Sequence, residues 1–273
     1  MRFILAFVLI LFSSCVNSKE KSYTGSTPVG AVVRSFFGIP LADSIDFMRW
    51  KLLIDKNNFT LICNYGMGKP NTNGFISGGK SVQFSGECRH DNNFYTLLKN
   101  GKELKLLKLN ENLLHLADSS NALLIGNSGW SYVLNSLSPV EASKLNITAP
   151  TTSLPDSMLY TGRTPCAVPG IIPQGTSCYK LKWKLVFYAD AANNNPTTYK
   201  VWGTPWRKVD GKTGRWKIRS TKDGQFIYEL EDENGKIFLK LLKADENILF
   251  FTDENENPLT GNEDFSYILN KEK

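Results

Sequence analysis

The feature that most constrains this chain is an internal repeat. Residues 104–135 align without a gap onto residues 239–270 at an offset of 135, and 16 of these 32 positions are identical. Shorter matches extend the repeat: residues 23–28 resemble residues 160–165, residues 49–52 resemble 182–185, and residues 94–97 resemble 227–230. Self-similarity of this kind indicates a duplicated domain. A residue kept in both copies is expected to be structural, whereas a residue found in one copy is free to serve function.

Each copy has the pattern of short β-strands separated by turns. Trp183, Leu185 and Phe187 alternate with polar or smaller neighbours, which is typical of a strand with one buried face. Asn-Gly at 100–101 and the run at 232–235 predict tight hairpins, since these residues tolerate positive φ. No segment keeps a helical apolar stripe for three turns. The sequence therefore predicts an all-β protein of two tandem antiparallel up-and-down β-barrels, which leave no open sheet edges.

The repeat also sets the expected domain boundaries. We expect a first barrel over 23–135 and a second over 160–273, each of a normal domain size. Residues 136–159 are rich in Ser, Thr, Pro and Asn and are predicted to be a linker, with one helical turn over 139–145. Residues 16–22 are expected to be a short polar tether.

The N-terminus reads as an export signal. Arg2 precedes an apolar run over 3–12, which is too short to span a bilayer but suits the core of a signal peptide. The residues before Cys15 resemble a bacterial lipobox, so residues 1–15 are predicted to be a lipoprotein signal with Cys15 as the lipidated residue. A plain signal peptide with a later cleavage site is the alternative. Acyl chains on Cys15 would anchor the protein to a membrane. The resemblance to lipoproteins implies the outer membrane, because Val16 stands where an aspartate would indicate retention in the inner membrane.

The net charge of +6 is spread along the chain without basic clusters on one element. A nucleic-acid-binding protein would gather its basic residues on one face, so we expect no nucleic-acid partner.

Four cysteines remain beyond Cys15: Cys63 and Cys88 in the first copy, and Cys166 and Cys178 in the second. Two cysteines per exported domain suggest one disulfide in each. Two free buried thiols per domain is the alternative.

The motifs of the second copy, in their order, resemble a known family. The residues are YTGRTPCAVPGI at 160–171, then WKLVF, Gly-Arg-Trp at 214–216, LFFTD at 249–253 and YIL at 267–269. They are similar to the N-terminal domain of the NlpE family of envelope lipoproteins, also called copper resistance or copper homeostasis proteins. The resemblance implies a small lipocalin-like barrel, a lipid anchor, and a role in envelope sensing or metal handling.

The chain departs from the family pattern at its metal motif. Two thiols two residues apart can chelate a soft ion such as Cu(I), but Pro169 stands where the second cysteine would be. Cys178 could fold back beside Cys166 as a thiolate ligand or as a disulfide partner. We therefore hold copper binding at Cys166 and Cys178 as an alternative to a structural disulfide or inert thiols, and expect no other cofactor.

Two other groups of residues are weighed as sites. Tyr199, Trp202, Trp206 and Trp216 occur close together beside basic residues, so they could form a ligand or partner surface or could be barrel core. His115 is replaced by Phe in the other copy, which favours a packing role over ligation.

No catalytic constellation stands out, so we predict a protein that is not an enzyme. It would be a lipid-anchored envelope protein that acts through contacts with a protein partner in binding, sensing or a copper or stress response. The alternative is a lipocalin-type carrier whose barrel holds a small apolar ligand or a metal ion.

Overall fold

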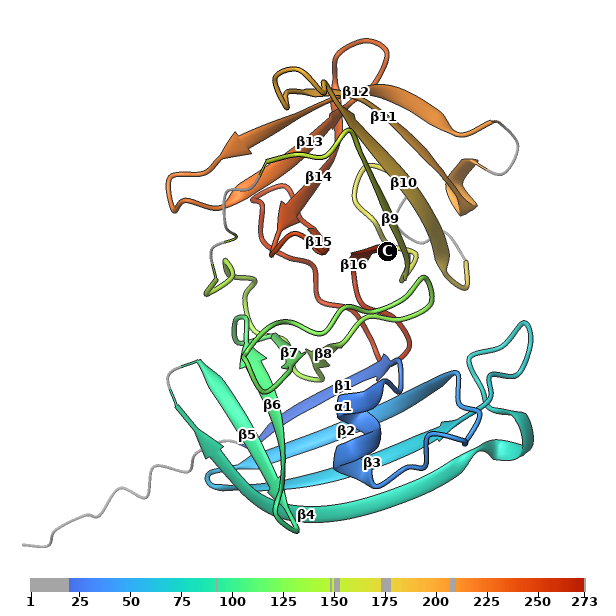
Figure 1. Ribbon diagram of the computed structural model, residues 1–273, viewed down its shortest axis with the longest axis vertical. Helices are drawn as coiled ribbons and strands as arrows, with labels where there is room; N and C mark the ends of the chain where they lie inside the picture. The colour runs from blue at the N-terminus through green and yellow to red at the C-terminus, as the bar shows by residue number, and fades with distance from the viewer. Residues whose placement is uncertain are drawn as a thin grey trace, which may run out of the picture.

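The computed structural model of the chain describes residues 20–91, 93–147, 149, 153–172, 178–206 and 210–272. Their strands form two closed antiparallel barrels of eight strands each, stacked one on the other (Figure 1). Every neighbour in each barrel is the next strand along the chain, except where the last strand meets the first. The predicted fold of two tandem up-and-down barrels is therefore confirmed.

The first barrel contains β1 (Lys21–Thr27), β2 (Phe47–Asp55), β3 (Asn58–Gly66), β4 (Lys80–His90), β5 (Phe94–Lys99), β6 (Lys102–Lys108), β7 (Leu113–Ala117) and β8 (Val133–Ser136). It also carries helix α1 (Ala31–Phe37) and a 3₁₀ turn, η1 (Ile76–Gly78). Pairing of Tyr23 with Ser136 and of Thr24 with Asn135 closes it. The chain enters β1 at Lys21, within the stretch expected to be a tether.

The second barrel contains β9 (Ser157–Thr164), β10 (Leu181–Ala189), β11 (Pro196–Gly203), β12 (Lys212–Ser220), β13 (Phe226–Glu231), β14 (Ile237–Lys243), β15 (Ile248–Phe251) and β16 (Ile268–Lys271). A 3₁₀ turn, η2 (Thr204–Trp206), follows β11. The barrel closes where β16 pairs with β9.

Turn residues and alternation explain these elements. Asn100 and Gly101 both have positive φ and connect β5 to β6 as a two-residue hairpin, as the sequence predicted. In β10 the burial alternates strictly from Leu181 to Phe187, with the lysines outside. α1 escaped prediction because its seven residues are too short to display a helical stripe over three turns.

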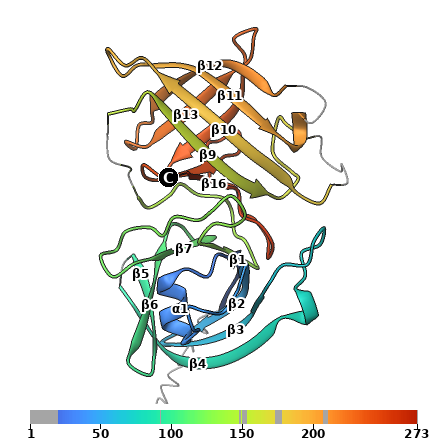
Figure 2. The same ribbon diagram turned by 45° about the vertical axis from the view of Figure 1, so that its right-hand side comes forward.

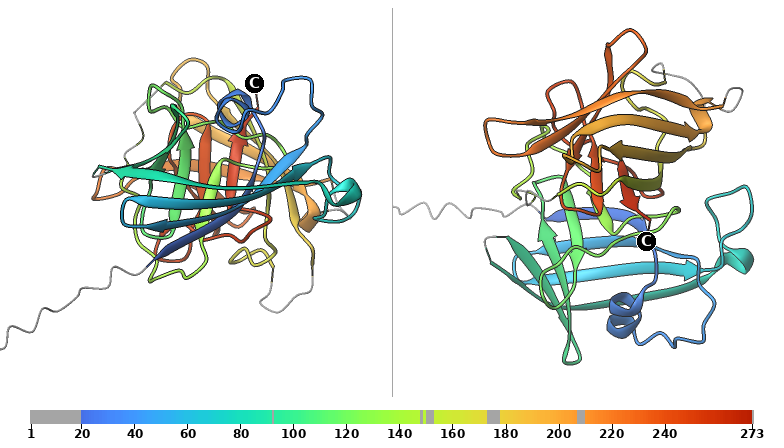
Figure 3. Two further views of the ribbon diagram at one scale, coloured as in Figure 1. Left: turned by 90° about the horizontal axis from the view of Figure 1, so that it is seen from below. Right: turned by 45° about the horizontal axis from the view of Figure 1, so that its top comes forward.

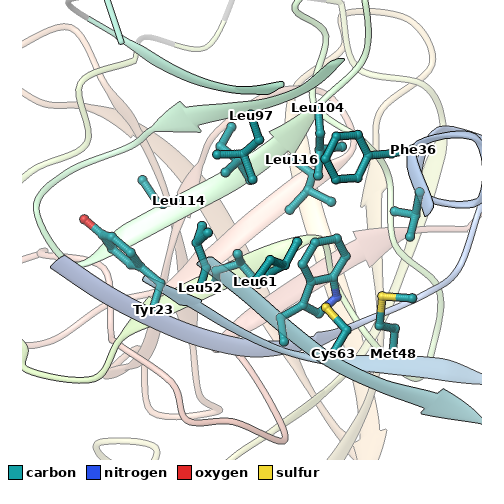
Figure 4. Close-up of a cluster of buried hydrophobic side chains, with 14 of the residues drawn as sticks. Tyr23, Phe36, Met48, Leu52, Leu61, Cys63, Leu97, Leu104, Leu114 and Leu116 are labelled. Carbon is teal, nitrogen blue, oxygen red and sulfur yellow. The ribbon is translucent and has the colours of Figure 1, made fainter. Parts of the chain in front are cut away.

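Both barrel interiors are filled by side chains. Tyr23, Leu52, Leu61 and Leu114 meet inside the first barrel and are almost fully buried (Figure 4). The second barrel has an equivalent cluster around Leu185, in which the aromatic rings of β10, β12 and β13 pack on one another. Such packing matches what an eight-stranded barrel of this size allows.

The two copies use the same hydrogen bond to fix their first strands. In the first barrel Trp50 Nε1–H donates to Thr27 Oγ1 at 2.8 Å, and in the second Trp183 Nε1–H donates to Thr164 Oγ1 at 2.9 Å. The indole is buried in both, so the hydroxyl satisfies a donor that water cannot reach. Residues kept in both copies are structural here, as the repeat suggested.

Different segments cover one end of each barrel. In the first, α1 packs Val33 and Phe36 into the core and lies against β6 (Figure 2). In the second, the segment after β9 buries Val168 in the corresponding core. Equivalent tyrosines hold both segments: the Gly30 N–H donates to the Tyr132 hydroxyl, and the Tyr267 hydroxyl donates to the Ala167 carbonyl. The end covers are thus where the copies diverge.

The barrels join through a third hydrophobic cluster. It combines outward-facing side chains of β6–β8 with those of β13–β16, and most of its members pair at the repeat offset: Leu107 with Leu242, Leu109 with Ala244, Leu113 with Ile248 and Val133 with Ile268. All are almost fully buried. Either barrel alone would therefore expose a continuous apolar face.

Two asparagines add reciprocal polar contacts across this junction. Asn135 accepts from the Gly261 N–H at 2.8 Å, and Asn270 accepts from the Gly126 N–H at 2.9 Å. Their amides donate to the carbonyls of the neighbouring residues, 262 and 127. Each residue of one contact differs by 135 from its counterpart in the other contact. The two barrels therefore make the same contacts with each other in both directions, as subunits do across a two-fold axis. The best-matching part of the repeat thus contains both this junction and the closing strands of each barrel.

The segment between the barrels is tied to both of them. Asn110 and Asn112 donate side-chain N–H groups to the carbonyls of Ser143 and Val140, and Gln225 of the second barrel donates to the Leu145 carbonyl. The helical turn predicted over 139–145 is wrong, since these carbonyls bond to side chains instead of to amides four residues on.

Candidate functional site

The predicted disulfide of the second copy is present. Cys166 and Cys178 are bonded, with their Cα atoms 5.9 Å apart, within the range that a disulfide requires. Each sulfur is joined to the other, so neither is a thiolate in this oxidised form. Within the described part of the chain, no group of three or more His, Cys, Asp or Glu residues is placed to hold a metal ion.

The disulfide expected in the first copy is absent, so that prediction is wrong. Cys63 and Cys88 are free and buried, and burial raises the pKa of both thiols. They lie on adjacent strands, but Cys63 faces Val82, whereas Cys88 lies beside Asn57. Six residues along a strand separate Asn57 from Cys63, which is about 20 Å at the usual rise per residue. A disulfide needs its Cα atoms within about 7 Å, so the strand register prevents the bond.

The aromatic group of the second copy is not one surface. Tyr199 and Trp216 are almost fully buried; the Tyr199 hydroxyl donates to the Glu231 carbonyl, and Trp216 Nε1–H donates to the Tyr188 carbonyl. Trp202 is on the outer face of β11, with Lys184 and Lys200 over its ring. Trp206 packs edge-on against Trp183. The strand alternation therefore sends neighbouring aromatic residues to opposite faces, which corrects the expectation of a common ligand surface.

The lipidation site Cys15 and its signal segment lie outside the described residues. Among the residues that are described, none of the helices has the length and apolar character to cross a bilayer.

The candidate site is a cleft of about 990 Å³ at the junction of the two barrels. The first barrel contributes Phe47, Trp130 and the β3–β4 connection, which projects beyond the end of the barrel (Figures 1 and 3). The second barrel contributes Arg163 of β9 and Lys180 and Lys182 around the start of β10. These three residues are called the cation cluster below.

Phe47, Trp130 and Arg163 line one side of the cleft and belong to a stack of flat groups. The ring of Phe47 stacks on Phe75 at 4.3 Å and on Trp130 at 4.5 Å, and both pairs are nearly parallel. The Arg163 guanidinium continues the stack over Trp130, 5.1 Å from the ring centre. The arginine comes from the other barrel, so the cation–π contact bridges the junction and sets the orientation of the guanidinium.

The cation cluster has no ion-paired acid among the residues that the structure describes. Arg163 and Lys182 are direct cross-strand partners of β9 and β10, an arrangement in which like charges repel. None of the three residues makes an ion pair with any residue that the structure describes. Burial lowers the pKa of Lys180, the charges of Arg163 and Lys182 lower it further, and the charge of Asp264 offsets this only in part. Burial also lowers the pKa of Arg163, and the charge of Asp46 offsets this only in part.

The equivalent place in the first copy is neutralised. Ser26 and Arg49 are the cross-strand partners there, and Arg49 forms an ion pair with Asp264 of the second barrel. Asn73 also donates to Asp264, at 2.5 Å. At the repeat offset, the residue that corresponds to Asp264 is Gly129. The duplication therefore has an ion-paired acid at this position in one copy and a glycine in the other, where Asp46 acts on Arg163 through its charge without forming an ion pair.

Sequence reasoning did not select this cleft. Its signal was present, because the matched segments place Arg163 against Ser26, a single-copy residue in an otherwise conserved strand. The approach of Arg163 to Trp130, however, joins residues of different barrels.

Comparison of the chain with protein-family models, with curated proteins and with solved structures finds no match.

Proposed function

We propose that this chain is a non-enzymatic binding or sensing protein of the bacterial cell envelope, anchored by lipid on Cys15 and resembling NlpE lipoproteins. It recognises its envelope partner through the cleft between the barrels. The observation that carries this proposal is the combination of two filled barrels with a concave, charged junction. Because core side chains occupy the interiors, a ligand or partner has to bind outside them.

This packing favours an interaction protein over the lipocalin-type carrier. A carrier needs a lined cavity inside the barrel, of about 300 Å³ or more for a small molecule. In both barrels the inward-facing residues instead form continuous hydrophobic clusters. A copper role would require the reduced form, since the disulfide uses both sulfurs. Titration of the reduced protein with Cu(I), with Cys166→Ser as the control, tests that role.

The proposed function is tested by crosslinking in native membranes. A photo-reactive amino acid replaces Lys69 in the cleft or, as the matched control, Lys222 in the turn between β12 and β13. Both positions are exposed. We expect a discrete protein adduct from position 69 that position 222 does not give. Equal adducts from both positions, or none from position 69, would contradict the role of the cleft. Deleting one barrel is unsuitable as a test, because it would expose the shared hydrophobic cluster.

Anchoring is tested separately by Cys15→Ala. We expect the protein to move from the membrane fraction to the soluble fraction after export. Retention in the membrane fraction would remove the lipid anchor from the proposal.

A further inference from the structure

The cation cluster gathers positive charge that the rest of the cleft does not balance. Lys69 adds a fourth cation to the lining, against the two acids Asp46 and Asp264. Asp264 is already engaged by Arg49 and Asn73, and Asp46 accepts the Gly68 N–H at 2.6 Å. Neither acid is within ion-pair distance of the cation cluster.

Arg163 is built to accept a ligand with oxygen atoms. One face of its guanidinium lies over Trp130, and no hydrogen bond from its N–H groups reaches an acceptor in the described parts of the chain. The group is about half-buried, so these donors are only partly hydrated. A planar guanidinium held in this way presents two parallel donors, the geometry that phosphate and carboxylate oxygens match.

The charge count distinguishes between these two groups. A carboxylate brings one negative charge, whereas a phosphate monoester brings close to two near neutral pH. The cation cluster holds three positive charges, two of them on cross-strand partners. A phosphate monoester offsets these charges better than a carboxylate does. Lys180 and Lys182 flank the arginine and would supply point charges to the same group.

We propose that the cation cluster of the inter-barrel cleft is a binding site for a phosphate group, held by Arg163 and flanked by Lys180 and Lys182. This inference rests on the proposed function, since it names the ligand chemistry of the same cleft. The phosphate belongs either to a free small molecule or to a lipid headgroup, and the experiment below separates these sources.

The repeat supplies a sharp test at Gly129. A side chain added there would begin 3.7 Å from the Arg163 guanidinium, and Gly129 occupies the position of the neutralising Asp264. Gly129→Asp would therefore place a carboxylate in the phosphate site, while Gly129→Ala makes the same backbone change without the charge. Inorganic phosphate and pyrophosphate are titrated into the full chain at low salt, with calorimetry and tryptophan fluorescence as readouts.

We expect saturable binding that weakens as salt is added, with Gly129→Ala close to the natural chain. Gly129→Asp and Arg163→Ser, which copies the first repeat, should bind about tenfold or more weakly. Arg215→Ser removes an exposed cation of β12 away from the cleft and should bind normally. Unaltered near-ultraviolet circular dichroism shows that each variant is folded. If Arg163→Ser does not fold, Lys182→Gln replaces it as the variant that removes a cation from the site.

Co-sedimentation of the Cys15→Ala chain, which lacks the proposed anchor, with phosphatidylcholine vesicles, with and without phosphatidic acid, identifies the source. Binding to phosphatidic acid that Gly129→Asp abolishes supports a headgroup, and binding of the soluble phosphates alone supports a free ligand. No saturable binding in either arm, or equal binding by Gly129→Asp and Gly129→Ala, would overturn the site. If the crosslink from position 69 persists in that case, only the phosphate inference fails and the proposed function stands.

Discussion

His115 allows a quantitative test of the junction between the barrels. It lies on β7 opposite Val133, a member of the shared hydrophobic cluster, and is fully buried. Its Nδ1–H donates to the Leu116 carbonyl at 2.8 Å, and its Nε2 has no partner among the described residues. Burial lowers the pKa of His115 from the ordinary 6.5 to about 4, and the Leu116 bond offsets this only in part. The folded protein therefore keeps the ring neutral.

The expected effect of pH follows from this difference. Below pH 6.5 the unfolded chain takes up a proton on His115, whereas the folded chain does so only near pH 4. Stability is therefore fully present above pH 6.5 and falls as the pH drops toward 4. At about 1.4 kcal/mol per pH unit, the contribution of this group amounts to about 3 kcal/mol.

His115→Phe tests the magnitude, because the equivalent residue Phe250 fills the same position of the other copy. We expect the variant to be at least as stable as the natural chain at neutral pH, since it removes a buried acceptor without a partner. Urea unfolding at several values between about pH 7 and pH 4.5 should show its advantage growing by a few kcal/mol as the pH falls. His90→Gln, at an exposed strand end, is the matched control. A stability difference between His115→Phe and the natural chain that stays constant with pH would refute the reasoning.

Three further predictions concern stability. Reducing the Cys166–Cys178 bond, or replacing Cys178 by Ser, should lower the free energy of unfolding by about 2–3 kcal/mol by freeing a short loop. Non-reducing peptide mapping should find this pair bridged. An unchanged melting temperature after reduction would contradict the prediction. Asn135→Ala removes hydrogen bonds across the junction and should lower the free energy of unfolding by about 1–3 kcal/mol, because buried partners lose their hydrogen bonds. A loss below about 0.5 kcal/mol in chemical unfolding would argue against a stabilising role for these contacts. Trp216→Ala should cost about 3–5 kcal/mol, whereas Trp202→Ala on the outer face should cost under about 1 kcal/mol; equal losses would contradict the assignment of the two rings to opposite faces.

Much of the fold could be predicted because its signals are local. Alternation along 181–187 and the Asn-Gly turn at 100–101 fix strands and hairpins from neighbouring residues. α1 has no such signal, since its two turns are held by contacts of Val33 and Phe36 with the barrel core and by contacts with β6, which is distant in the sequence. The pairing of cysteines also failed for this reason: whether Cys63 and Cys88 meet depends on strand register.

The sequence by itself determined the duplication, the all-β character and the equivalence of the two barrels, because a repeated pattern of apolar spacing and turn residues needs no knowledge of distant contacts. Only the tertiary structure decided how the copies join. The contacts of Asn135 with Gly261 and of Trp130 with Arg163 bring together residues of different barrels. Such contacts depend on the relative position of two finished barrels. That position turned the repeated strands into a junction and set Trp130 against Arg163, whereas the register of β9 and β10 placed Arg163 beside Lys182.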